Sequence, residues 1–178
     1  MTIHSASTAR LLEQLHIQST LMLPVVIRAA QHSDLAKLEW FGTYAHFRDL
    51  YRRTWLDHQA GQRLMLVADL RGFPVGQVWL DVTPFEYAYL YALRVFEPLQ
   101  ALGIGTQLIH AAEVLAGQHG YTQLQLAVEK VNRSARRLYE REGFQIFGQR
   151  VDVWSYTDQH GQIHWIQEDV YAMRKALG

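Results

Sequence analysis

The chain of 178 residues suits one globular domain, and 49% of its residues are hydrophobic, which is enough for a sizeable core. Lys plus Arg and Asp plus Glu each number 17, so no overall field would draw the protein onto nucleic acid or an anionic membrane. The absence of Cys excludes disulfides, thiolate metal sites and a Cys nucleophile, so the chemistry must use oxygen, nitrogen or a cofactor.

Residues 1–24 are expected to form an N-terminal extension, helical over 9–17, and residues 25–178 a single domain. The apolar run at 21–27 is short and holds a proline, so it cannot cross a bilayer. The first residues also lack the basic, apolar and small-residue succession of a secretory signal. We therefore expect a soluble cytoplasmic protein, which also agrees with the lack of Cys.

Alternating apolar residues and turn signals predict strands and helices along the chain. The predicted strands cover 25–29, 64–69, 75–82, 88–96, 122–128, 144–156 and 163–174. Helices are predicted from Leu35 after an N-cap at Ser33 or Asp34, in one or two pieces over 40–62, and over 106–118 and 132–141. Together they predict an α/β fold with a mixed, mostly antiparallel sheet, a central right-handed parallel strand-helix-strand crossover and helices on both faces.

A glycine-containing turn, Gln100–Thr106, joins a predicted strand to a predicted helix. Gly103 and Gly105 let the backbone approach an anion without a Cβ in the way, and the N–H groups of the first helical turn favour negative charge. Thr106 could add a hydroxyl donor. The turn predicts a pyrophosphate site, with a plain tight turn as the alternative. A Rossmann dinucleotide site is disfavoured, because Leu108 stands where the third glycine belongs.

The segment after the next strand carries a second motif, Asn132-Arg133-Ser134-Ala135-Arg136-Arg137-Leu138-Tyr139-Glu140-Arg141-Glu142-Gly143-Phe144. It resembles the Asn-x-x-Ala-x-x-Leu-Tyr-x-x-x-Gly-Phe segment of the GNAT superfamily of N-acetyltransferases. The turn at 100–106 resembles that family's Gln/Arg-x-x-Gly-x-Gly/Ala loop. Both motifs stand in the family's order and spacing, and the predicted elements agree with a GNAT-like fold over residues 25–175.

The resemblance implies that acetyl-CoA is the acyl donor and that Tyr139 protonates the departing thiolate, a role that suits a phenol neutral at pH 7. It also implies that the Val95 N–H stabilises the developing oxyanion. The residues expected to bind the cofactor are Leu93, Val95, Gln100, Ala101, Leu102, Gly103, Ile104, Gly105, Thr106, Asn132, Arg136 and Tyr139.

Several of these residues also have structural interpretations. Asn132 is placed to cap the following helix, and Tyr139, two turns along the same face, could be an ordinary half-buried aromatic residue. Arg137 and Arg141 suit a solvated basic face. The loop departs from the family in having no basic residue, so backbone donors would provide most of the phosphate binding.

An attacking amine must lose a proton, and the sequence offers no carboxylate at the expected place. Many relatives have a Glu on the strand before the loop, where this chain has Tyr89. Glu86, at the start of that strand, is the candidate base, acting through a water molecule that Tyr89 or Tyr91 orients.

The predicted function is transfer of an acetyl group from acetyl-CoA to a primary amine of a small molecule or peptide, by direct attack in a ternary complex. The alternative is an acyl-CoA-binding sensor or scaffold of the same fold with little turnover. The nine histidines lack metal-ligand spacing, so no metal is expected, and edge strands in the closing hairpin suit a homodimer. Candidate walls of the acceptor pocket are Arg48, Arg52, Arg53, Trp79, Trp154 and Trp165.

Overall fold

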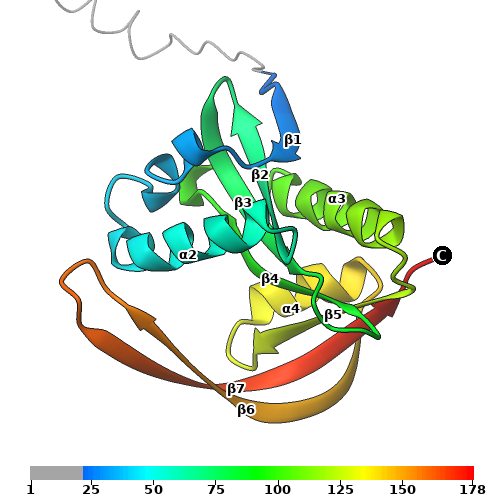
Figure 1. Cartoon of the computed structure of the whole chain (residues 1–178). Coiled ribbons are helices and arrows are strands. Elements are labelled where there is room, and N and C mark those ends of the chain that lie inside the picture. Colours follow the sequence, from blue (N-terminus) through cyan, green and yellow to red (C-terminus); the bar gives the residue numbers. More distant parts are fainter. Residues whose placement is uncertain (1–21) are drawn as a thin grey trace, which may run out of the picture.

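A seven-stranded sheet forms the centre of the computed structural model, which describes residues 22–178. Its strands lie in the order β1-β2-β3-β4-β5-β7-β6, and within these residues only β4 and β5 pair in parallel (Figure 1). The predicted mixed, mostly antiparallel sheet is thereby confirmed. The strands are β1 (Val25–Ala29), β2 (Arg63–Leu70), β3 (Phe73–Asp81), β4 (Ala88–Val95), β5 (Gln123–Glu129), β6 (Gln145–Thr157) and β7 (Ile163–Ala176).

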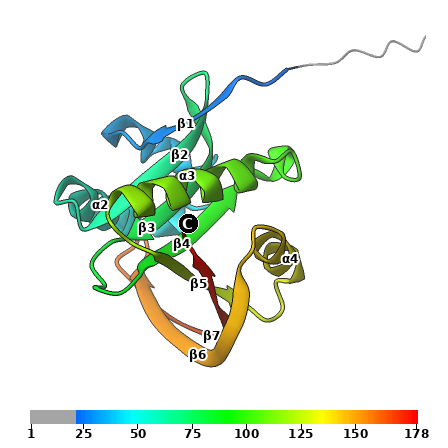
Figure 2. The same ribbon diagram turned by 90° about the vertical axis from the view of Figure 1, so that its right-hand side faces the viewer.

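Helices cover both faces of the sheet, because side chains along each strand alternate between two cores. Leu66 of β2 packs in the core under α3 (Ile104–Gln118) and α4 (Arg133–Arg141). Its neighbour Met65 packs in the other core, under α2 (Arg48–Gln59). Figure 2 shows α3 lying across its face of the sheet. The predicted helices at 106–118 and 132–141 are confirmed, whereas the one predicted over 9–17 lies outside the described residues.

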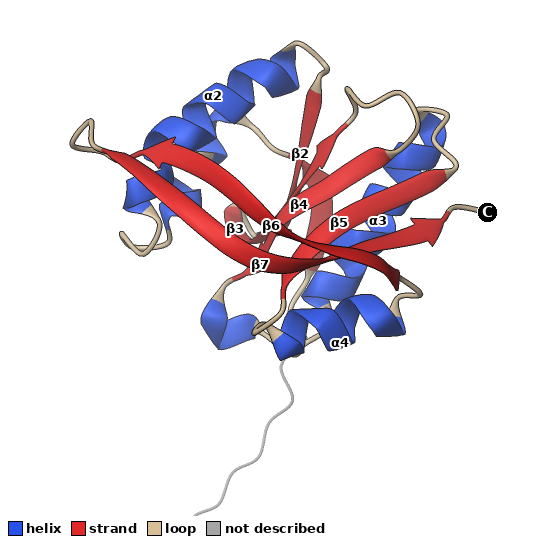
Figure 3. Ribbon diagram, turned by 90° about the horizontal axis from the view of Figure 1, so that it is seen from below, coloured by secondary structure: helices blue, strands red, loops and turns tan. Residues whose placement is uncertain are grey.

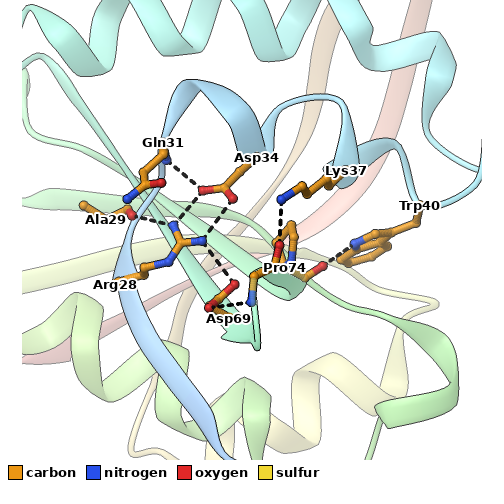
Figure 4. Close-up of polar contacts among 9 residues, drawn as sticks. Arg28, Ala29, Gln31, Asp34, Lys37, Trp40, Asp69 and Pro74 are labelled. Atoms are coloured by element: carbon orange, nitrogen blue, oxygen red, sulfur yellow. Dashed lines mark hydrogen bonds and ion pairs between the residues drawn. The ribbon is translucent and has the colours of Figure 1, made fainter.

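The segment before α2 forms three short 3-10 turns, His32–Asp34, Lys37–Glu39 and Ala45–Phe47. These turns replace the helix predicted from Leu35 and the start of the helical region predicted over 40–62, of which α2 is the regular part. Trp40 has a φ of 40°, which interrupts any regular helix. Its ring is 3% exposed, and its indole Nε1 donates to Pro74 O at 2.8 Å (Figure 4). Burial of this side chain therefore outweighs local helical propensity.

An ion-pair cluster ties this segment to the edge of the sheet. Arg28 of β1 donates to the two carboxylate oxygens of Asp34 at 2.7 and 3.0 Å and to Asp69 of β2 at 3.1 Å (Figure 4). Burial opposes ionisation of Asp34, but hydrogen bonds from Arg28 and from the Gln31 N–H lower the pKa of its carboxyl below the usual value. The turns that lead to α2 are thus held in place electrostatically.

The hairpin of β6 and β7 forms one end of the sheet, and its tip extends toward α2 (Figure 1). The rings of Trp154 and Tyr156, on β6, meet Phe47 with centroid separations of 6.2 and 4.8 Å. These contacts close one end of the molecule with an aromatic wall.

The parallel strands β4 and β5, seen from below in Figure 3, pair only at their beginnings. Their register covers Ala88 with Leu124 and Tyr89 with Gln125. Further along, Ala92 has a φ of 52° and the β3–β4 register shifts, so β4 bends away from β5. The edge of β4 that faces β5 therefore has no partner strand beyond Tyr89 within residues 22–178, whereas its other edge remains paired with β3.

Gly76 of β3 sets how closely α3 approaches the sheet. A Cβ at this position would lie 3.0 Å from Leu108 Cδ1 and 3.2 Å from Ile104 Cγ2. We expect Gly76→Ala to lower the free energy of unfolding by about 1–3 kcal/mol, because a tightly packed core resists an added methyl group. Gly117→Ala, on α3 with open space around it, should be neutral or stabilise by up to about 1 kcal/mol. Chemical denaturation measures both, and equal stabilities would contradict the prediction.

Candidate functional site

A cavity of about 930 Å³ lies where β4 and β5 separate. Its walls come from the end of β4, the turn before α3, the first turn of α3, the end of β5 and α4, so it joins the two sequence motifs. The lining residues are Tyr44, Leu93, Arg94, Val95, Leu99, Gln100, Ala101, Gly103, Ile104, Gly105, Thr106, Glu129, Asn132, Ser134, Ala135, Arg137, Leu138, Tyr139 and Arg141.

The turn before α3 can hold phosphate groups with its backbone. Ala101 and Gly103 have φ of 62° and 84°, and α3 begins at Ile104, so the N–H groups of its first turn have no partner inside the helix. The side-chain Nε2 of Gln100 donates to Val95 O at 3.1 Å, which ties the turn to the end of β4. Free donors and the positive end of the helix dipole therefore meet at one wall of the cavity.

The hydroxyl of Thr106 is already committed to a neighbouring helix end. It donates to Glu142 Oε1 at 2.8 Å, and His110 Nε2 lies 2.8 Å from Oε2 of the same carboxylate. Burial disfavours this charge, but the bonds from Thr106 and His110 lower the pKa of the Glu142 carboxyl. A hydroxyl has one proton to donate, so Thr106 would meet a phosphate through its backbone N–H instead.

Helix α4 brings Asn132 and Tyr139 to the same cavity. Asn132 Oδ1 accepts the Ala135 N–H at 3.0 Å, so this residue caps the helix as well as lining the cavity. Tyr139 is 7% exposed, and burial, with a smaller contribution from Tyr89, raises the pKa of its phenol. The phenol therefore keeps its proton at neutral pH and can act as a proton donor.

Comparison with known proteins assigns the family. The family model described as Acetyltransferase (GNAT) family matches residues 30–144, a span that contains both motifs. The chain belongs to the GNAT acetyltransferase family.

Two curated relatives share part of this sequence. The chain is 38% identical over 88 residues to a mycothiol acetyltransferase of Jonesia denitrificans, which covers 49% of this chain and 28% of that protein. It is 34% identical over 74 residues to the uncharacterized N-acetyltransferase YycN of Bacillus subtilis, covering 40% and 47%. The chain thus spans less than half the length of these two relatives.

Solved structures of GNAT proteins share the fold. The yncA structure from Salmonella typhimurium, with its cofactor acetyl-CoA, superimposes with a TM-score of 0.68 at 19% identity, covering 86% of this chain and 94% of that one. The ribosomal-protein-S18-alanine N-acetyltransferase of Escherichia coli gives 0.66 at 21% identity, with the same coverage. At such identities the likeness establishes the fold alone.

Most of the predicted cofactor-binding residues of this GNAT protein line the cavity; Leu102 and Arg136 do not. Leu102 is 58% exposed on the loop. The guanidinium of Arg136 turns to Glu140, 3.4 Å away, and to the ring of Tyr171, whose centroid lies 5.8 Å from its Cζ. Arg137 and Arg141, which the sequence assigned to a solvated face, are exposed and also line the cavity.

The two residues predicted to handle the amine proton occupy different environments. Glu86 is exposed in the loop between β3 and β4 and does not line the cavity. Tyr89 is half-buried on β4, close enough for its charge to influence the pKa of Tyr139. The carboxylate that does line the cavity is Glu129, at the end of β5.

The candidate walls of the acceptor pocket lie outside the lining of this cavity. Trp79 is 1% exposed in the core, whereas Trp165 is 73% exposed on the hairpin. Trp154 belongs to the aromatic wall beside Phe47. The three arginines, Arg48, Arg52 and Arg53, lie on the exposed surface of α2.

Three ionisable residues that line the cavity, Tyr44, Arg94 and Glu129, are not predicted from the sequence. The positions of two of them could have identified them from the sequence. Arg94 directly precedes the predicted cofactor-binding residue Val95, and Glu129 stands at the end of the next predicted strand. No such position marks Tyr44, since it reaches the cavity through the irregular fold of the turns before α2.

Within residues 22–178, no group of three or more His, Cys, Asp or Glu side chains is placed to hold a metal ion. No helix of this described region has the length and apolar character needed to cross a membrane.

We expect Gly103→Ala to weaken coenzyme A binding by about tenfold or more, a loss of about 1.4 kcal/mol, because a Cβ would stand where the backbone must approach the diphosphate. Gly120→Ala is the matched control, since both glycines have a positive φ, 84° and 85°, and open space around them. Each change strains the backbone by about 1–2 kcal/mol. Gly120, however, follows the C-terminal end of α3 and does not line the cavity, so its substitution should not affect binding. Isothermal titration calorimetry measures both, and equal dissociation constants would refute the phosphate role of the loop.

Proposed function

We propose that this protein transfers an acetyl group from acetyl-CoA to a primary amine of a small molecule or peptide, by direct attack in a ternary complex. The observation that carries the proposal is the cavity at the unpaired edge of β4, which runs from the glycine turn to the buried phenol of Tyr139. Membership of the GNAT family supports the same chemistry.

The cofactor would bind mainly to backbone groups. The N–H groups of Gly105 and Thr106 would hold its diphosphate, with Arg137 and Arg141 adding charge from α4. The pantetheine arm would lie along Leu93 and Val95 and would pair with β4 where β5 no longer does.

The Val95 N–H is available to the acetyl carbonyl. The next N–H along the strand, that of Phe96, donates to Val75 O at 2.8 Å on the β3 side. Because successive N–H groups of a strand point to opposite edges, the Val95 N–H points toward the open edge. It would therefore stabilise the oxyanion that forms during attack.

The reaction proceeds by attack of the neutral amine nitrogen on the thioester carbon, after which the C–S bond breaks. Tyr139 gives its proton to the thiolate, and solvent then restores the phenol. The amine proton passes to Glu129, directly or through a water that Tyr89 orients, since Glu86 lies away from the cavity. Positioning of the two substrates would supply much of the acceleration.

We expect Tyr139→Phe to lower turnover by about ten- to a thousandfold, because the thiolate then leaves without an acid, while coenzyme A affinity is retained. Thiol release from acetyl-CoA with a panel of amines measures the rate. Burial raises the pKa of Tyr139 above the ordinary value of 10.0, so wild-type turnover should show no loss from this group up to about pH 10.

Tyr121→Phe serves as the control for this substitution. Its hydroxyl lies 2.6 Å from Val82 O and 3.0 Å from Pro84 O and can donate to one of them, so its loss should cost about 1 kcal/mol of stability and leave turnover intact. Unchanged turnover in Tyr139→Phe would remove the phenol from the mechanism. Tight coenzyme A binding with no thiol release from any amine would favour the sensor alternative.

A further inference from the structure

Arg94 stands beside the place where the acetyl group would react. It lies on β4 between Leu93 and Val95 and lines the same cavity. Leu93 and Val95 pack toward the core under α3, so Arg94 projects to the opposite face, toward the turns before α2. Its guanidinium carbon is 5.0 Å from the ring centroid of Tyr44 and 4.8 Å from that of Phe47.

The charge of Arg94 has no counter-ion at contact distance. Within residues 22–178 it forms no salt bridge, whereas Arg28, Arg48 and Arg150 each hold a carboxylate at 2.7 Å or less. Its Nη1 is inaccessible to solvent and has no hydrogen-bond partner in that region. The aromatic rings attract the cation but leave this Nη1 group without an acceptor, and a buried N–H donor that lacks a partner is costly.

The histidine of the same aromatic cluster, His46, does not compete with Arg94 for an anion. His46 packs on Phe47 at 4.1 Å and on Tyr156 at 5.6 Å between centroids, and burial, aided by the charge of Arg94, lowers the pKa of its imidazole. Burial raises the pKa of the Glu168 carboxyl on β7, and the charge of Arg94 opposes that rise only weakly. Glu168 forms no salt bridge with Arg94 among the described residues. Arg94 thus places a cation within the aromatic wall, whereas Arg137 and Arg141 line the cavity from α4.

We propose that Arg94 binds a carboxylate of the acceptor, so that the substrate is a primary amine that also carries a carboxylate, as a free amino acid does. The inference rests on the proposed acetyl transfer and specifies its acceptor. A guanidinium pairs with a carboxylate through two parallel N–H bonds, which fixes the orientation of the bound molecule. Because Arg94 directly precedes Val95 in the chain, its guanidinium lies no further from the Val95 N–H than the reach of one arginine side chain, so an amine and a carboxylate of one small molecule can occupy both sites.

The test compares matched acceptors: amino acids, their carboxamides and the corresponding decarboxylated amines. We expect the wild-type protein to prefer the amino acids by about 30-fold or more in kcat/KM, the scale of losing one partner of a buried charge pair. Arg94→Gln should raise KM for amino acids and abolish this preference, and Arg94→Lys, which keeps charge but loses the planar fork, should be intermediate. Arg71→Gln, the same change at an exposed position in the turn between β2 and β3, should keep the preference.

Binding of the product measures the same contact without turnover. With coenzyme A present, calorimetry should show an N-acetyl amino acid binding about 30-fold tighter than its amide, and Arg94→Lys should weaken that binding even if Arg94→Gln does not fold. Transfer to amines with no preference for carboxylates, or a preference that survives Arg94→Gln, would overturn the inference and leave acetyl transfer standing. Coenzyme A binding without transfer to any acceptor would instead overturn the proposed function.

Discussion

The structure depends on one constraint: β4 and β5 lose their backbone pairing after Tyr89 and Gln125. Strand N–H and C=O groups without partners must bind something else. The bend at Ala92 creates this free edge inside the sheet, where it faces a cavity rather than the outer rim. An extended ligand with amide groups can pair with such an edge as a strand would, and the pantetheine arm of coenzyme A is a ligand of that kind.

The remaining parts of the site follow from the topology around that opening. A strand-helix-strand crossover starts its helix where the first strand ends, so α3 begins beside the free edge, and α4 begins after β5 at the same side of the sheet. Glycines let these helices approach closely: a Cβ on Gly105 would lie 3.2 Å from Leu138 Cδ2. The spacing between the phosphate-binding turn and Tyr139 is therefore set by close packing of two helices.

Local patterns predicted most of the fold and part of the site. Strand alternation, the glycine turn and the spacing of Asn132 and Tyr139 are all encoded within short segments, so the sheet, α3 and α4 could be placed from sequence. Long-range contacts decided the rest. The predicted helix is interrupted at Trp40, whose indole N–H donates a hydrogen bond to Pro74 O. The Thr106 hydroxyl donates a hydrogen bond to Glu142, 36 residues away. The sequence around Arg94 is that of an ordinary strand, and its importance follows from its long-range contacts with the rings of Tyr44 and Phe47.

The site combines a backbone-based hold on the cofactor with few ionisable groups near the reacting atoms, which suits catalysis by positioning. A structure of the protein with acetyl-CoA bound tests this account most directly. It should place the diphosphate on the first turn of α3, the pantetheine arm along the free edge of β4, and the sulfur within about 3–3.5 Å of the Tyr139 hydroxyl. Coenzyme A bound on another surface, or a sulfur directed away from Tyr139, would contradict it.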